Sequence, residues 1–158
     1  MRGQSKYKKK IITPDIRFGS TTIAKFTNYI MERGKKSTAQ KIVYESLEEA
    51  SKAIKKEPQE IFNKVISQVA PNVEVRSKRI GGANYQIPVD VKEPRRTALA
   101  MRWIIDAAKS KKGMPMKSRL AEVYKESIEG VGSAMKKRSD VQKMAEANKA
   151  FAHFARSR

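Results

Sequence analysis

The sequence predicts a mainly α-helical, single-domain protein, a bundle of about six helices with one protruding β-hairpin between the third and fourth helices. The chain has 158 residues, which suits one domain with a modest core. Its apolar residues recur at helical spacing, except between residues 73 and 91, where the period changes to two. No internal repeat or linker divides it. We therefore expect one helical domain over residues 13–158 behind a flexible basic arm over residues 1–12.

Three helices are expected in the first half of the chain. Ser20 or Thr21 is a candidate N-cap for the first helix, which ends near Gly34. Ser37 begins a capping-box pattern that opens the second helix. Pro58 suits the first position of the third helix, because no N–H is needed there. The apolar positions expected on their inner faces are Ile23, Phe26, Ile30, Ala39, Val43, Leu47, Ala50, Ile54, Ile61, Phe62, Val65, Ile66 and Val69.

The segment over residues 73–91 is typical of a β-hairpin. Apolar or small side chains alternate with charged ones in its first half, and every second residue over 85–91 is apolar. Gly81 and Gly82 mark the turn between the strands. An isolated two-stranded hairpin is marginally stable in water. We therefore expect its base to pack on the helices or its tip to dock on a partner.

Three more helices follow the hairpin. Pro94 lies at the expected start of the fourth, which is apolar nearly all round over residues 98–105 and is therefore predicted to be central. The fifth carries an apolar stripe over residues 116–128 and ends at Gly130. The sixth begins near Ser133. It runs through Val141, Met144, Ala145 and Asn148.

The charge balance restricts the partners of this chain. There are 35 Lys+Arg against 16 Asp+Glu, which gives a formal charge of +19. Such a surface repels itself unless a polyanion neutralises it, so the partner is nucleic acid or an acidic membrane. A membrane role is disfavoured, because no run approaches the roughly 18 apolar residues of a span and the basic groups are spread over several elements. We expect no secretory signal and a cytoplasmic location.

The sequence contains few residues that could act in catalysis. The only histidine is His153, and the chain has no cysteine to form a disulfide, a thiolate nucleophile or a zinc site. Gly81 and Gly82 are not followed by the Lys-Ser/Thr of a phosphate-binding loop. We therefore expect a protein that is not an enzyme and that uses no cofactor, metal or small-molecule substrate.

Basic residues gather in five groups along the chain. A solvated surface explains any one group equally well, but five groups with few balancing acids favour phosphate contact. Arginine ranks above lysine, because its planar fork grips phosphate in two places and stacks on bases. The RNA-binding candidates are Lys8, Lys9, Lys10, Lys35, Lys36, Arg76, Lys78, Arg79, Arg95, Arg96, Arg102, Lys136, Lys137, Arg138 and Lys143.

The two aromatic candidates for base stacking differ. Trp103 is surrounded by apolar residues and is expected in the core. Tyr85 lies with Asn84 near the hairpin tip, where packing on the protein and stacking on a base are about equally favoured.

Four blocks of the chain, taken in order, resemble the ribosomal protein seven family of the small subunit, in its bacterial type. They are residues 18–44 with the sequence GKKS at 34–37, residues 73–89, residues 95–103 and residues 144–153. The first six residues match no family pattern. The resemblance implies six helices with a protruding β-ribbon, in agreement with the elements expected above.

The resemblance also implies a function. It implies direct binding to the 3′ domain of small-subunit ribosomal RNA, which nucleates assembly of the head. It implies a place at the subunit interface near the exit-site tRNA, with small-subunit ribosomal proteins nine and eleven as neighbours. The RNA-facing residues it implies fall in the basic groups above, and the hairpin tip close to tRNA would comprise Gly81, Gly82, Asn84 and Tyr85.

A DNA architectural protein is the main alternative from another class. Some DNA benders also combine a helical body with a basic β-arm, but those arms carry a wedge residue, often proline, at the tip. Here the tip is Gly81-Gly82, and Pro88 lies well down the second strand. The sequence therefore favours RNA.

Overall fold

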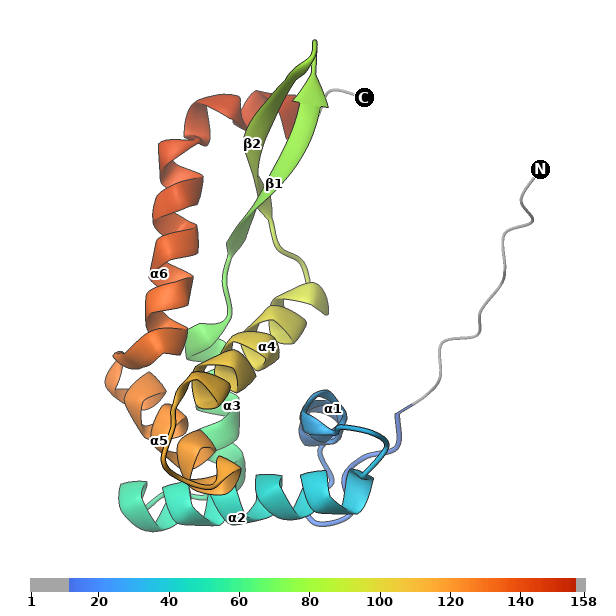
Figure 1. Cartoon of the computed structure of the whole chain (residues 1–158), viewed down its shortest axis with the longest axis vertical. Coiled ribbons are helices and arrows are strands. Elements are labelled where there is room, and N and C mark those ends of the chain that lie inside the picture. Colours follow the sequence, from blue (N-terminus) through green and yellow to red (C-terminus); the bar gives the residue numbers. More distant parts are fainter. Residues whose placement is uncertain (1–11, 156–158) are drawn as a thin grey trace, which may run out of the picture.

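The computed structural model describes residues 12–155, and within that part it is mainly helical with one hairpin (Figure 1). The elements in order are α1 (Thr21–Ile30), α2 (Lys36–Ile54), α3 (Pro58–Val69), β1 (Val73–Ile80), β2 (Ala83–Asp90), α4 (Arg95–Ser110), α5 (Met116–Glu129), α6 (Gly132–Ala147) and the 3₁₀ helix η1 (Lys149–Ala155). The predicted fold class is confirmed, and η1 is an addition. The basic arm with Lys8, Lys9 and Lys10 lies outside the described residues.

Local sequence explains most helix boundaries. Ser20 is the N-cap of α1, where its Oγ accepts a hydrogen bond from the N–H of Ile23 at 3.4 Å. Pro58 occupies the first turn of α3 as predicted. Gly130 ends α5 with a positive φ of 79°.

The junction between α1 and α2 differs from the prediction. Helix α1 ends at Ile30, well before Gly34, and Arg33 and Gly34 both have positive φ, 51° and 75°. This left-handed pair turns the chain into α2 at Lys36, so Ser37 lies inside the first turn and no side chain caps the helix. The predicted capping box is therefore wrong.

The core lies where the body helices α1–α5 meet. Phe26 packs edge-on against Phe62 with ring centroids 5.2 Å apart, and Tyr124 lies 6.5 Å from Phe26. Full burial of such side chains contributes about 1.5–3 kcal/mol each. Helix α4 contacts α1, α3, α5 and α6, as a central helix should, and the half-buried Trp103 packs on the core as predicted. However, α4 exposes Arg102, so it is not buried all round.

The segment before α1 is fastened to the body by Asp15. Its side chain is buried, and it accepts hydrogen bonds from the N–H groups of Arg17 and Phe18 and from the Tyr44 hydroxyl at 2.7 Å. Burial, followed by the bond to Asp15, raises the pKa of Tyr44 to about 12. The chain that continues from the N-terminal arm is thus fixed beside α2.

The hairpin stands away from the body with α6 and η1 alongside it (Figure 1). Its antiparallel register pairs Val73 with Asp90 and Ile80 with Ala83, with Gly81 and Gly82 in the turn. Ile87, midway along the hairpin, is 2% exposed, and Val91 at its base is 9% exposed, in line with the expected packing of the lower hairpin on the helices.

Helix α6 buries few of its side chains. Its buried residues are Ala134 and Ala145, whereas Met144 is 50% exposed. The helix contacts β1 as well as α3, α4 and α5 at its own start, so most of its length has packing on one narrow side only. The helix ends at Ala147, so Asn148, which was expected inside it, is its C-cap.

Candidate nucleic-acid interface

One buried carboxylate joins the hairpin to α4. Glu74 on β1 is 7% exposed and accepts hydrogen bonds from Arg76 Nε at 2.5 Å and from Arg95 Nε at 2.6 Å. Both arginine side chains remain about half exposed, at 56% and 52%. Glu74 therefore holds two predicted RNA-binding arginines in place while leaving much of each guanidinium open to solvent.

The protonation of Glu74 follows from these two contacts. Burial on its own would raise the pKa of the carboxyl, but the hydrogen bonds from Arg95 and Arg76 outweigh it, and the pKa lies below its ordinary value. Glu74 is therefore ionised at neutral pH, and the arginine pair keeps its charged partner.

The other predicted cations are not neutralised by the acids of the chain. Apart from the pairs of Glu74, the ion pairs in the described part are made by Arg17, Lys41, Lys109, Lys111 and Lys117, none of which was predicted to bind RNA. The predicted residues that form no ion pair over residues 12–155 include Lys35, Lys36, Arg79, Arg96, Arg102, Lys136, Lys137, Arg138 and Lys143. Cations outside the predicted set, such as Lys25, Arg33 and Lys64, also form no ion pair over residues 12–155, so the surplus positive charge extends beyond the predicted positions.

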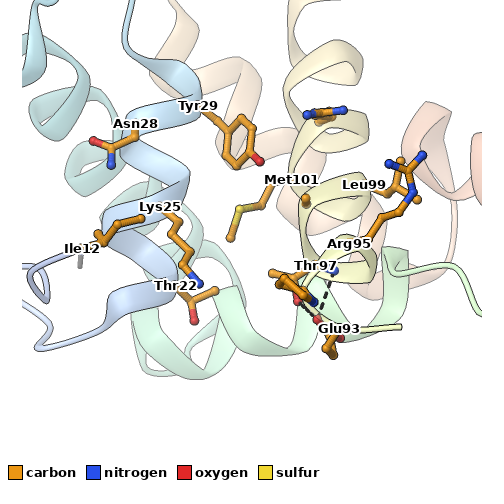
Figure 2. A pocket seen from close by; sticks show the side chains of 13 residues that line it. Ile12, Thr22, Lys25, Asn28, Tyr29, Glu93, Arg95, Thr97, Leu99 and Met101 are labelled. Atoms are coloured by element: carbon orange, nitrogen blue, oxygen red, sulfur yellow. Dashed lines mark hydrogen bonds between the residues drawn. The ribbon is translucent and has the colours of Figure 1, made fainter. Parts of the chain in front are cut away.

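A cleft of about 660 Å³ separates α1 from the first half of α4 (Figure 2). We call it the α1–α4 cleft. Tyr29 and Lys25 from α1 and Met101 from α4 point into the space between the two helices. Its lining residues are Ile12, Thr22, Lys25, Asn28, Tyr29, Glu93, Pro94, Arg95, Thr97, Ala98, Leu99, Met101 and Arg102.

Arginines connect this cleft to the hairpin. Arg95 lines the cleft and also pairs with Glu74 at the hairpin base. The Arg102 guanidinium lies over the Tyr29 ring, 5.7 Å from its centroid. We call Lys25, Arg76, Arg79, Arg95 and Arg102 the hairpin–cleft surface. In Figure 1 the hairpin, the start of α4, α1 and the start of α2 follow one another down one side of the view.

A second basic group lies on α6. Lys136, Lys137, Arg138 and Lys143, which we call the α6 surface, all lie on this helix, the first three near its start. Three of the four, Lys136, Arg138 and Lys143, line an open groove together with Gly130. Arg138 is the most fixed of them, since its Nη1 donates to the backbone oxygen of Gln68 at 2.6 Å. In Figure 1 α6 runs on the side of the hairpin opposite to α1. Eight of the predicted residues therefore lie on two surfaces, and Lys35, Lys36, Lys78 and Arg96 belong to neither of them.

The hairpin tip combines exposed and packed residues. Gly81, Gly82 and Asn84 are exposed. The Tyr85 ring lies 5.2 Å from Phe151 and 5.4 Å from Phe154, and Lys78 Nζ donates to the Phe154 backbone oxygen at 3.2 Å. Tyr85 is therefore half-buried against η1, and packing on the protein takes at least part of the ring that base stacking would use.

Sequence reasoning did not single out Lys25 or Tyr29. The two are four residues apart, so they share one face of α1. That spacing was visible in the sequence, but the contact of this face with α4 depends on the tertiary packing. Only the structure unites them with Arg102.

No alternative chemistry stands out in the described part of the chain. Over residues 12–155 no three His, Cys, Asp or Glu side chains lie together as a metal site would require. No helix in that range is long and apolar enough to cross a membrane.

Comparison with known proteins supports the resemblance seen in the sequence. The family model described as ribosomal protein S7p/S5e matches residues 1–149. A protein of Pseudothermotoga lettingae named small ribosomal subunit protein uS7 is 55% identical over 142 residues, 90% of this chain and 92% of that protein. Proteins of the same name from Chromohalobacter salexigens and Polynucleobacter necessarius are each 51% identical, covering 92% and 98% of this chain and 94% and 99% of their own lengths.

This family consists of ribosomal proteins and not of enzymes, so the prediction of a non-enzymatic protein is confirmed. The match spans the helices, the hairpin and both basic surfaces, and therefore covers every element on which the functional argument rests. The chain belongs to the ribosomal protein S7p/S5e family.

Proposed function

We propose that this chain is a primary RNA-binding protein of the small ribosomal subunit, which binds the 3′ domain of the small-subunit RNA and nucleates assembly of the head. Membership of a ribosomal protein family makes it a structural component that associates with ribosomal RNA and proteins in the ribosome. The 3′ domain and the nucleating role come from the resemblance of residues 18–44, 73–89, 95–103 and 144–153 to that family.

The observation that carries the proposal is that most of the predicted RNA-binding cations in the described part of the chain form no ion pair with an acidic side chain. Acidic side chains neutralise lysines such as Lys111 and Lys117, whereas Arg79, Arg102 and Lys136 have no carboxylate partner within residues 12–155. Unpaired cations on a protein of charge +19 supply the counterion release that drives binding to RNA. Glu74 fixes the orientation of the Arg76 and Arg95 guanidinium groups, so that they can match the fixed phosphate positions of a structured RNA.

Finer assignments follow from the same resemblance. The hairpin tip, with Gly81, Gly82, Asn84 and Tyr85, would approach the exit-site tRNA at the subunit interface. Small-subunit ribosomal proteins nine and eleven would be neighbours. The exposure of Gly81, Gly82 and Asn84 supports this assignment, because a tip used for contact must be open.

Binding to a fragment of the 3′ domain at several salt concentrations tests the proposal. Duplex DNA and an unrelated folded RNA of equal length serve as competitors. We expect affinity that falls with salt and a preference for the ribosomal fragment of about 1,000-fold or more. Equal binding to all three would reject a specific ribosomal RNA site, and equal affinity for DNA would favour the DNA architectural alternative.

A further inference from the structure

The α1–α4 cleft has a floor and a rim of different chemistry. Met101 forms part of the floor and is fully buried, and the Tyr29 ring, 41% exposed, stands beside it (Figure 2). Lys25, Arg95 and Arg102 supply positive charge around this apolar patch. A surface that only met phosphates would need the charges and not the apolar floor.

The size of the cleft matches a small planar ligand. Its volume of about 660 Å³ lies within the range typical of small-molecule sites. The exposed Tyr29 ring offers a surface on which a flat base stacks, and this stacking is a general mode of recognition for unpaired nucleotides. The positive rim selects a ligand that carries anionic groups beside its flat part.

We propose that the α1–α4 cleft receives one unpaired nucleobase of RNA, with the phosphates on either side of that base contacted by Lys25 and Arg102. The inference rests on the proposed function, because it says which feature of the RNA, an unpaired nucleobase, this part of the RNA-binding surface recognises. Arg102 lies over Tyr29, so a base that packs on Tyr29 brings its backbone within reach of this guanidinium. Lys25 has no carboxylate partner within residues 12–155 and is available on the opposite wall.

Glu93 adds a preference among bases. Among the described residues 12–155 it is the only acid that lines the cleft, and its carboxylate accepts a hydrogen bond from the Thr97 hydroxyl at 2.6 Å (Figure 2). A carboxylate repels phosphate and accepts from amino groups, so the edge of the base faces Glu93 while the backbone faces Lys25 and Arg102. Bases with an exocyclic amino group, of which guanine also offers a ring N–H, are therefore preferred over uracil.

Trinucleotide RNAs of equal charge test the inference on the full chain. One has a central guanosine, one a central uridine and one an abasic ribose, and the readouts are the dissociation constant and the ¹³C-methyl shift of Met101. We expect guanosine to bind about 10-fold more tightly than the abasic RNA, the amount that one stacked base contributes, and to shift the Met101 signal. The uridine RNA should lie between them.

Two substitutions assign the effect to the cleft. Tyr29→Leu should reduce the difference between base and abasic RNA to about 2-fold, because the stacking surface is lost. Tyr85→Leu, a matched change at the hairpin tip, should leave the difference intact. Glu93→Gln should remove the preference for guanosine over uridine and keep the preference for either over the abasic RNA. Melting curves confirm that each variant is folded.

Each outcome decides between two readings. If the abasic RNA binds as well as the others, or no trinucleotide shifts Met101 at millimolar concentration, the cleft does not receive a base and the inference is overturned. The proposed function would still hold if the protein binds the 3′-domain fragment specifically, because that measurement is independent of the cleft. If the wild-type protein shows no specific binding to that fragment, the proposed function is overturned instead.

Discussion

The hairpin–cleft surface and the α6 surface carry similar charge but hold it differently. On the first, Arg76 and Arg95 share the carboxylate of Glu74, and Arg102 lies over Tyr29. On the second, Lys136, Lys137 and Lys143 form no ion pair over residues 12–155. Arginines fixed in this way lose less freedom on binding, whereas unfixed lysines act mainly through their charge.

The difference separates affinity from specificity within one protein. Oriented guanidinium groups present a fixed pattern of donors that only a matching arrangement of phosphates and bases satisfies. Flexible ammonium groups neutralise any phosphate within reach and supply salt-dependent affinity with little selection. We therefore expect the hairpin–cleft surface to recognise the RNA and the α6 surface to strengthen its attachment.

The largest expected effect comes from removing two charges from each surface in turn. Arg95→Ala with Arg102→Ala should weaken binding to the 3′-domain fragment about 100-fold, since each loses a charge-assisted hydrogen bond. Lys136→Ala with Lys137→Ala should weaken it about 5-fold. Fluorescence anisotropy over a range of salt measures both, and each double variant should reduce the salt slope by about 1.5. Equal losses of affinity would remove the distinction between the surfaces.

Removing the carboxylate that orients the arginines is expected to have the next largest effect. Glu74→Gln keeps the shape of the side chain and leaves Arg76 and Arg95 in place without their charged partner. We expect RNA affinity to fall about 5-fold through lost orientation, even though the protein gains positive charge. Glu45→Gln, which removes a partner of Lys41 and Lys117, is the control and should not weaken binding. Tighter binding by the Glu74 variant would show that net charge outweighs orientation.

Much of this molecule was accessible from its sequence. The helices were predictable because Ser20, Pro58 and Gly130 act through local rules, and Gly81-Gly82 fixed the hairpin turn in the same way. The α1–α2 junction was not, because the left-handed conformation of Arg33 is rare for a non-glycine residue.

The site was only partly predictable for a related reason. Basic groups are visible as residue types, so the candidate list was obtained without coordinates. The clamp of Glu74 on Arg76 and Arg95 and the union of Lys25 with Arg102 depend on the packing of the hairpin and α1 against α4. Contacts between elements far apart in the chain leave no periodic signal in the sequence.

The pH dependence of the free energy of unfolding tests the ion pairs of Glu74 on the hairpin–cleft surface. The pKa of Glu74 is lowered in the folded protein, so its ionised form stabilises the fold above the ordinary carboxyl pKa, and this stabilisation is lost as pH falls through the lowered value. We expect wild type to exceed Glu74→Gln by about 1 kcal/mol at neutral pH, since half-exposed arginines are screened by solvent. Urea unfolding at a series of pH values should show this difference vanish in acid. A constant difference would mean that Glu74 stabilises by packing alone.

The smallest expected effect concerns the hairpin tip, which lies at the far end of the hairpin from Glu74. Phe154→Ala removes one of the two rings that pack on Tyr85, and global stability should change by about 0.5–1 kcal/mol because the site is half-exposed. Amide exchange over residues 78–85 should accelerate, while residues near Glu74 stay protected. Arg79→Ala is the matched change, expected to lower RNA affinity about 3-fold without altering exchange. If Phe154→Ala also accelerates amide exchange near Glu74, the two ends of the hairpin form one cooperative unit. The positions of Arg76 and Arg95 would then depend on η1 as well as on Glu74.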